Sequence, residues 1–224
     1  MNDLSSQLVN LRKNYREIFL TTAREILDKV QKIKPEDCEG EIFETFPPKS
    51  RGREWQNTVL EHLEQWRTNN YYENMKNYRN ECSCEGCGTC CRFAVSEFSP
   101  EELKTKAQNG DSFAKQFTET FILYSSIQDA KNIYPEYIDM LEKTGETGYY
   151  FYHCPKVTTD NKCPDYENRP QICRDFPDNP IAFLPKTCGF TAWKLKSEHI
   201  CLKLNAEAEI INFYKAKIKE AQKL

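Results

Sequence analysis

Four cysteines lie within eight residues near the middle of this 224-residue chain, in the segment Cys84-Glu-Gly-Cys87-Gly-Thr-Cys90-Cys91. Two sulfurs in a Cys-x-x-Cys turn can converge on one metal, and this spacing is typical of zinc and iron–sulfur ligation. Gly86 and Gly88 permit positive φ angles and let backbone N–H groups approach a bound sulfur. The segment therefore predicts a loop that wraps a metal centre.

The adjacent pair Cys90-Cys91 is the unusual part of this segment. Side chains of neighbouring residues usually point apart, so two adjacent cysteines rarely bind one ion together. The pair indicates either two metal centres or one ligand held in reserve.

Four further cysteines follow later in the chain, and two of them precede proline. Proline after a ligand fixes φ and removes a backbone donor, and a Cys-Pro step also follows the last ligand in bacterial ferredoxin runs. The rest of the ferredoxin spacing is missing, as is the three-plus-one spacing of radical enzymes. These later cysteines are Cys154, Cys163, Cys173 and Cys188.

The stretch Cys-Pro-Asp-Tyr-Glu-Asn-Arg-Pro-Gln-Ile-Cys-Arg-Asp-Phe-Pro at residues 163–177, taken with the CxxCxxCC segment upstream, resembles the YkgJ-type cysteine-cluster family. That family is described as a zinc- or iron-chelating domain, and both signatures occur here in the family's order. The resemblance leaves out Cys38, Cys82 and Cys201; we expect Cys201 to be a buried thiol. The resemblance implies that the metal-ligand set is Cys84, Cys87, Cys90, Cys91, Cys154, Cys163, Cys173 and Cys188.

Two arginines could compensate the negative charge of such a centre. Four thiolates around a divalent zinc ion, or around a four-iron cluster of core charge two plus, leave about two negative charges. Arg169 and Arg174 flank Cys173 and could donate hydrogen bonds to the ligand sulfurs from outside. The alternative is that both arginines pair with carboxylates between residues 165 and 175.

The identity of the metal is left open by the thiol ligands, because thiolate-only ligation suits both iron and zinc. The compact first loop, its glycines and the Cys-Pro steps favour an iron–sulfur cluster of the four-iron type. Two closed four-thiolate zinc sites are the alternative. Eight ligands would also allow one centre of each kind.

Composition excludes several classes of protein. The 31 Lys and Arg against 34 Asp and Glu are interspersed and give a net charge of −3, so no basic footprint for nucleic acid exists. No apolar run approaches the ~18–20 residues that span a bilayer, and the first residues lack the basic and apolar regions of a signal peptide. We therefore expect a cytoplasmic protein that does not insert into membranes. Its 11 cysteines should then serve metal chemistry rather than disulfides.

Helical elements are expected on both sides of the cysteines. Apolar side chains recur every three or four residues over residues 4–34, which predicts a long helix ended by Pro35. A second stripe over residues 55–78 predicts another helical stretch, giving an antiparallel hairpin joined through residues 47–48. A last amphipathic helix should begin at Ser197. Such stripes form a core or an oligomer seam, so the arms could also support self-association or hold a partner protein.

Shorter elements lie between these helices. Ser99 starts a capping box with Glu102, and Asp111 precedes another helical face. The aromatic run 149–152 predicts a strand that leads into His153, and a turn at 159–161 would make residues 149–165 a hairpin delivering Cys154 and Cys163 to one site. His153 could replace a ligand, although a histidine beside a ligand is more often a spectator.

The fold class expected is mainly α with small β elements: a helical N-terminal arm over residues 1–80 and an irregular cysteine-rich domain with a C-terminal helix over residues 81–224. The first functional hypothesis is a metal-binding protein that holds one or two iron–sulfur or zinc centres. The second is an enzyme, because the domain is similar to that of flagellin lysine N-methylases, which implies methyl transfer from S-adenosylmethionine to protein lysines. The residues offer no GxGxxG or GxxxxGK[ST] loop and no catalytic assignment. The third hypothesis is a zinc-stapled interaction module.

Overall fold

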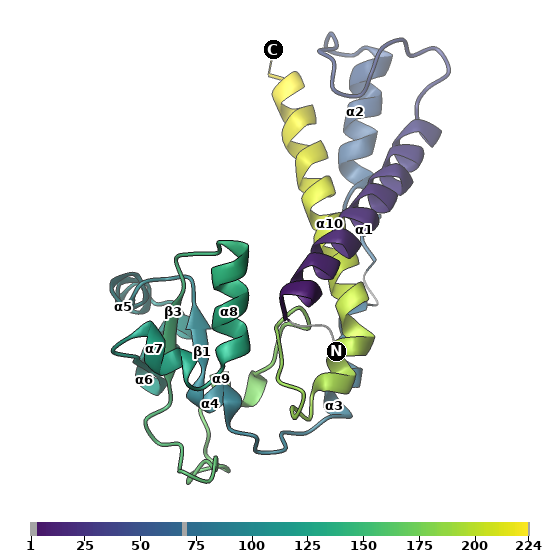
Figure 1. The fold of residues 1–224 in the computed structure, drawn as a ribbon. Helices are drawn as coiled ribbons and strands as arrows, with labels where there is room; N and C mark the ends of the chain where they lie inside the picture. Colours follow the sequence, from purple (N-terminus) through teal and green to yellow (C-terminus); the bar gives the residue numbers. More distant parts are fainter. Residues whose placement is uncertain (1–3, 69–70, 224) are drawn as a thin grey trace. The chain divides into compact units, whose positions relative to one another are not determined.

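A computed structural model describes residues 4–68 and 71–223, and contacts divide the chain into two compact units. The first unit comprises residues 1–10 and 80–194, and the second comprises residues 11–79 and 195–224. Helices dominate both, and a small antiparallel sheet lies in the first unit (Figure 1). The expected fold class, mainly α with small β elements, is therefore confirmed.

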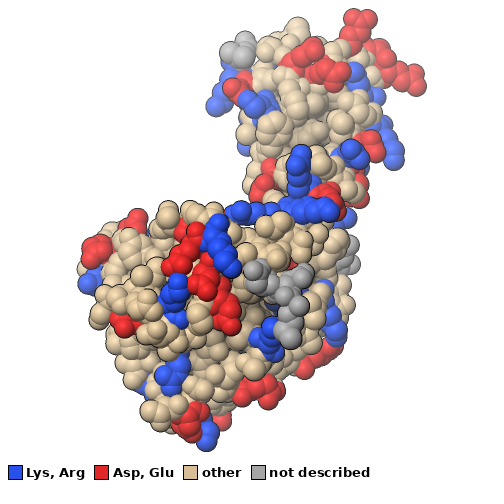
Figure 2. Space-filling model, viewed as in Figure 1, with Lys and Arg blue, Asp and Glu red and all other residues tan. Residues whose placement is uncertain are grey.

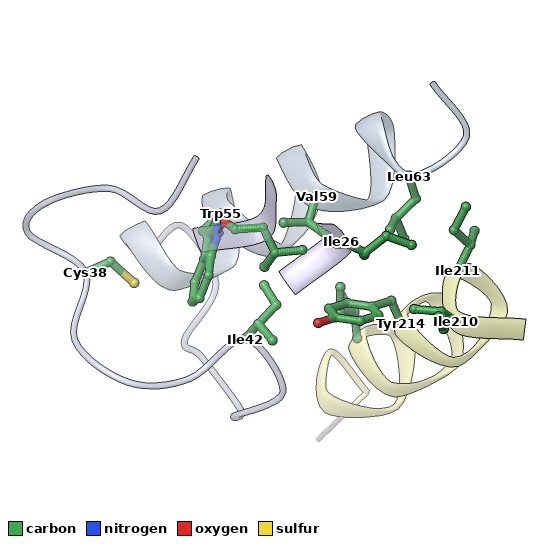
Figure 3. Close-up of a cluster of buried hydrophobic side chains, with 11 residues drawn as sticks. Ile26, Cys38, Ile42, Trp55, Val59, Leu63, Ile210, Ile211 and Tyr214 are labelled. Carbon is green, nitrogen blue, oxygen red and sulfur yellow. Dashed lines mark hydrogen bonds between the residues drawn. The ribbon is translucent and has the colours of Figure 1, made fainter. Parts of the chain in front are cut away.

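The second unit is built from helices α1 (Leu4–Lys32), α2 (Arg51–His62), α3 (Tyr71–Asn80) and α10 (Thr191–Ala221). The ends of three of these helices belong to the first unit: residues 4–10 of α1, Asn80 of α3 and residues 191–194 of α10. Within the second unit the apolar stripes pack on one another, as the close-up shows (Figure 3). The indole of Trp55 is buried and donates to the Val30 carbonyl oxygen over 3.1 Å. The side chains drawn at this core include Ile26, Ile42, Trp55, Val59, Leu63, Ile210, Ile211 and Tyr214.

A polar side chain fixes the long connection between α1 and α2. The buried amide of Gln56 donates to the carbonyl oxygens of Ile42 and Glu44, each over 2.9 Å. Ser50 accepts from the Arg53 backbone N–H and caps the start of α2. Because these bonds hold the loop on the core, the hairpin turn expected at residues 47–48 becomes a packed segment of about 18 residues, longer than common helix connections.

Two helix boundaries differ from the sequence prediction. The stretch expected over residues 55–78 is interrupted, because α2 ends at His62 and α3 begins at Tyr71. The backbone N–H and the hydroxyl of Thr68 donate to the buried carboxylate of Glu207, over 3.0 and 2.6 Å, which holds the chain in this break. At the other end, α10 begins at Thr191, six residues before the expected Ser197.

The first unit contains a three-stranded sheet whose middle strand is the last of the three in the sequence. Strand order is β1-β3-β2, all antiparallel, with Ala94 opposite Tyr152 and Ile122 opposite His153. The elements in chain order are α4 (Thr89–Arg92), β1 (Ala94–Ser96), α5 (Pro100–Gln108), α6 (Ser112–Thr120), β2 (Ile122–Leu123), α7 (Ile127–Lys131), α8 (Pro135–Thr144), β3 (Tyr150–His153) and α9 (Gln171–Asp175).

Alternating side chains of β3 bind helices to both faces of the sheet. Phe151 packs with Phe93 and with residues of α7 and α8 on one face, and the Phe93 and Phe151 rings lie 5.4 Å apart. Tyr152 faces the other side, where it meets Phe117 of α6 at 5.0 Å and the buried Leu103 of α5. A strand whose successive side chains enter two cores is held firmly, so β3 gives the residue that follows it a fixed position.

Several local predictions are confirmed in this unit. Ser99 and Glu102 form the reciprocal capping box, with Pro100 at the first position of α5. Asp111 caps α6 by accepting from the Ala114 backbone N–H over 2.9 Å. The predicted strand before Cys154 is β3.

The predicted hairpin over residues 149–165 is wrong in its second arm. Both edges of β3 already pair with β1 and β2, so the later segment has no free edge to join. Residues 154–170 instead form loops, including a tight turn in which the Thr158 backbone N–H donates to the Lys162 carbonyl oxygen over 3.0 Å.

The surface carries mixed charge. Acidic and basic side chains are interspersed on the face that Figure 2 shows, in line with the net charge of −3. Among the helices within residues 4–68 and 71–223, none combines the length and the apolar character that a membrane crossing requires.

Candidate metal centre

The CxxCxxCC segment begins as a loop without regular secondary structure and ends in the one-turn helix α4, which carries Cys90 and Cys91. Gly86 and Gly88 have φ angles of 67° and 72°, which confirms the predicted positive φ at both glycines. Gly88 is the N-cap of α4, and a Cβ there would come within 2.5 Å of the Asn161 side chain. Glycine is therefore needed at position 88 for both its backbone angle and its close contact.

Cys154 is held beside Cys91 by the backbone. It follows β3 directly, and its N–H donates to the carbonyl oxygen of Cys91 over 2.6 Å. The strand that enters two cores thus delivers this cysteine to the end of α4, 63 positions away in the sequence.

Arg92 fixes the turn that precedes Cys163. Its Nε donates to Asn161 Oδ1 over 2.7 Å, and its terminal nitrogen donates to the Thr158 carbonyl oxygen over 2.6 Å. Asn161 itself has a φ of 67°, an angle that asparagine tolerates better than most residues. Because Arg92 directly follows Cys91, these bonds tie the loop of Cys163 to the CxxCxxCC segment.

Cys173 and Cys188 reach the same region from later segments. Cys173 lies on α9, whose Ile172 N–H donates to the Gln116 side chain of α6 over 3.1 Å. Cys188 precedes Gly189, where an added Cβ would overlap the Ser83 carbonyl oxygen and lie 2.8 Å from Glu85 Cγ. The backbone at Cys188 thus packs directly on the first residues of the CxxCxxCC loop.

Charge interactions around Cys90 connect it to the CxxCxxCC loop. A hydrogen bond that its thiol donates to the Cys91 sulfur raises the pKa of Cys90, and burial raises it further. Negative charge on Cys91 adds to this rise, as does negative charge on Cys84 and Cys87. Cys90 therefore shares its surroundings with the two earlier cysteines of the motif.

Cys188 has the same neighbours. Burial raises the pKa of Cys188, against the effect of a hydrogen bond from the Phe190 backbone. Negative charge on Cys87, Cys84 and Cys82 also raises it. We call Cys84, Cys87, Cys90 and Cys188 the Cys90 group; Cys82 lies beside this group.

Cys173 has different neighbours. Burial raises the pKa of Cys173 to about 11, and negative charge on Cys91 and Cys154 adds to the rise. Arg169 opposes it, and Cys163 contributes a further small rise. We call Cys91, Cys154, Cys163 and Cys173 the Cys91 group.

Cys91 differs from its sequence neighbour in its preferred protonation. The hydrogen bond received from Cys90 lowers the pKa of Cys91, against burial, and the positive charges of Arg169 and Arg92 lower it further. Cys91 is therefore the better thiolate of the adjacent pair, and it lies where the two groups meet.

The thiols are neighbours but do not form a closed ligand shell. Within the described parts of the chain, no three Cys, His, Asp or Glu side chains are arranged so that they could hold an ion as they stand. The eight cysteines of the two groups are partly exposed and carry free thiols. Their type and number fit zinc or an iron–sulfur centre, and rotation of the side chains would be needed to close a shell.

The two predicted arginines have separate positions. The guanidinium of Arg169 lies 3.7 Å above the Tyr166 ring and its Nε donates to the Tyr166 carbonyl oxygen over 3.0 Å, while its charge acts on Cys91 and Cys173. Arg174 lies on α9. Hydrogen bonding of either arginine to a ligand sulfur stays a prediction.

Residues outside the expected ligand set lie elsewhere or have other partners. The His153 ring packs on Tyr124 at 4.6 Å, in the role of a structural neighbour. Cys38 is buried in the core of the second unit. Cys201 is partly exposed on α10, so its expected full burial is wrong.

Sequence reasoning missed Arg92 and Asn161, although both sit next to predicted features. An arginine directly after the Cys-Cys pair, and an asparagine in a Thr-Thr-Asp-Asn turn, were the available signals. What joins them is a contact across 69 positions, which no local pattern contains.

Comparison with known proteins agrees with the position of these cysteines. A family model described as "CxxCxxCC: Putative zinc- or iron-chelating domain" matches residues 83–201, just over half of the chain. The matched span contains all members of the Cys90 and Cys91 groups and excludes Cys38 and Cys82. No curated protein and no solved structure matches the chain at a significant level.

Proposed function

Since the chain belongs to the CxxCxxCC family of zinc- or iron-chelating domains, we propose that it binds zinc or iron through the eight cysteines of the Cys90 and Cys91 groups. The observation that carries the proposal is the gathering of these thiols from five separate segments of the chain. Charge interactions and backbone contacts connect residues as far apart as Cys84 and Cys188. Local sequence spacing alone would not bring those two thiols together.

The protonation of the thiols supports a role in binding cations. The hydrogen bond to Cys91 and burial raise the pKa of Cys90, and burial and neighbouring thiolates raise the pKa of Cys173 and Cys188, so these thiols hold their protons in the metal-free chain. A bound zinc ion or cluster would supply the positive charge that keeps the sulfurs as thiolates, and its binding would release protons. Nearby Arg92 and Arg169 stabilise the remaining negative charge around Cys91.

The loops that carry the later cysteines also support the proposal. Between β3 and α10 the regular structure is the five-residue helix α9, and the remainder consists of turns and loops. A loop-rich segment buries little apolar surface, and metal ligation can replace that missing stabilisation. The proposal also places the protein in a reducing compartment such as the cytoplasm, because ligand thiols must stay reduced.

The test is the metal and acid-labile sulfide content of full-length protein purified without oxygen. About four irons and four sulfides per cluster would assign iron–sulfur ligation, whereas roughly two zinc ions and no sulfide would assign closed thiolate sites. A Cys38→Ser, Cys201→Ser variant serves as the matched control and should keep the full metal content. A wild-type chain that takes up neither zinc nor iron with sulfide would overturn the proposal.

A further inference from the structure

We infer that the adjacent residues Cys90 and Cys91 bind different metal centres, so that the Cys90 group and the Cys91 group are two separate four-thiolate sites. The inference rests on the proposed function, since it concerns how the chelating thiols are shared. It assigns Cys84, Cys87, Cys90 and Cys188 to one site. It assigns Cys91, Cys154, Cys163 and Cys173 to the other.

The backbone supports the second assignment. The Cys154 N–H bonds to the Cys91 carbonyl oxygen over 2.6 Å, so the two residues lie together before any metal binds. Arg92 brings the 158–162 turn to the same end of α4 through its bonds to Asn161 and Thr158, and Cys163 follows that turn. Both contacts start from Cys91 or its immediate neighbour.

Close packing supports the first assignment. Gly189 approaches Ser83 and Glu85 so tightly that a Cβ would overlap the Ser83 carbonyl oxygen. Cys188 is therefore attached to the start of the CxxCxxCC loop, where Cys84 and Cys87 lie. Two overlapping Cys-x-x-Cys turns then direct Cys84, Cys87 and Cys90 toward one centre.

The helical geometry of α4 separates the adjacent pair. Successive residues on an α-helix are rotated by about 100°, because one turn contains 3.6 residues. Cys90 and Cys91 therefore leave α4 in different directions. Cys173 follows Ile172, which packs against the core containing Tyr152 of β3, and that strand ends directly before Cys154.

The alternative arrangement is one shared centre in which all eight thiols surround the same metal cluster. Three double variants of the full-length protein distinguish the two arrangements, each lacking two thiols. Cys84→Ser, Cys87→Ser removes half of the Cys90 group. Cys163→Ser, Cys173→Ser removes half of the Cys91 group. Cys87→Ser, Cys173→Ser removes one thiol from each.

The measurement is the number and affinity of bound metals by native mass spectrometry, after loading with the metal found in the wild type. Separate sites predict that each single-group variant loses half of the metal and keeps the other half at wild-type affinity. The mixed variant should keep no site at wild-type affinity. If all three variants lose the same metal with the same affinity change, the division into two sites is overturned. A wild-type chain that binds no metal would instead overturn the proposed function.

A second measurement needs no variant and so avoids any folding defect. Wild-type protein loaded to half occupancy is treated with a thiol-alkylating reagent, and intact chains are fragmented to locate the protected cysteines. Separate sites predict chains in which protection occurs in complete sets of four, either the Cys90 group or the Cys91 group. Protection that mixes members of both groups in a half-loaded chain would contradict the inference.

Discussion

The Cys90 group and the Cys91 group hold equal numbers of thiols in different electrostatic surroundings. Arg92 and Arg169 act on Cys91, and Arg169 also acts on Cys173. The Cys90 group lies instead beside Glu85, which accepts from the Ser83 hydroxyl over 3.3 Å and approaches Gly189. Nearby cations stabilise a negatively charged thiolate centre and nearby carboxylates destabilise it. Because both groups offer the same four thiol ligands, these neighbouring charges should decide the affinity, and we expect metal to bind more tightly at the Cys91 group.

The position of Cys82 strengthens this contrast. Its charge acts on Cys188, so a fifth thiol lies beside the Cys90 group. An extra thiol can replace a ligand during exchange of a metal between partners. We therefore expect the Cys90 group to release and take up metal faster than the Cys91 group.

Removal of all metal should abolish the difference between the groups and cause the largest loss of stability. Chelation should destabilise the first unit by up to about 10 kcal/mol, in the range of structural zinc sites. The loops over residues 154–190 should lose amide protection first, because they have little regular structure of their own. Hydrogen exchange monitored by mass spectrometry, with and without chelator, measures this. Unchanged exchange in these loops would show that the metal does not hold them.

Replacement of Gly189 by alanine should damage the Cys90 group alone. The new Cβ would overlap the Ser83 carbonyl oxygen, and relief of such crowding against backbone costs about 1–3 kcal/mol. Cys188 should move away and the metal at this group should be weakened, with the Cys91 group retained. Metal content and thermal unfolding report the change.

Gly86→Ala is the matched control for that variant. Gly86 lies in the same loop and has a φ of 67°, but no atom lies within 4 Å of a Cβ added there. Only the backbone cost of about 1–2 kcal/mol is therefore expected. Equal loss of metal in both glycine variants would contradict the packing argument for Cys188.

Replacement of Arg92 by alanine should weaken the Cys91 group. The variant loses two charged hydrogen bonds to the 158–162 turn, worth about 1.5–3 kcal/mol each. Loss of an outer partner of a metal site typically lowers affinity roughly 10- to 100-fold. Competition with a chelator measures the affinity of each site. Arg51→Ala, which removes an exposed arginine of the second unit, should leave both affinities unchanged.

The smallest effect concerns the adjacent pair in the metal-free chain. The pKa of Cys91 is lowered and that of Cys90 is raised, so a larger fraction of Cys91 is thiolate at neutral pH. Cys91 should therefore be alkylated on the order of tenfold faster than Cys90. Its rate should fall as the pH falls through the pKa of Cys91, since protonation removes the nucleophile. Arg169→Gln removes a positive charge, raises the pKa of Cys91 and should slow its alkylation. Equal rates at both cysteines would remove the electrostatic basis of the comparison.

The sequence was informative wherever a structure depends on nearby residues. Positive φ at Gly86 and Gly88, the Ser99 capping box and the strand before Cys154 all follow from local chemistry. The long apolar stripes likewise predicted helices. Each of these features is decided within a few positions of the chain.

Features decided by distant contacts could not be predicted in this way. The hairpin after Cys154 fails because β1 and β2 occupy both edges of β3. The break between α2 and α3 is held by Glu207, 139 positions away from Thr68. The grouping of the cysteines depends in the same way on Gly189 meeting Ser83 and on Arg92 meeting Asn161.

Cys188 also makes hydrogen bonds at the start of helix α10. Its carbonyl oxygen accepts from the backbone N–H of Thr191 over 3.1 Å and from the Thr191 hydroxyl over 2.7 Å, at the first residue of the 31-residue helix α10. Starting a helix is the unfavourable step of its formation, because several residues are fixed before the hydrogen bonds of the helix can form. A cysteine held in place by a metal would present this carbonyl already oriented, so metal capture would nucleate α10 during folding.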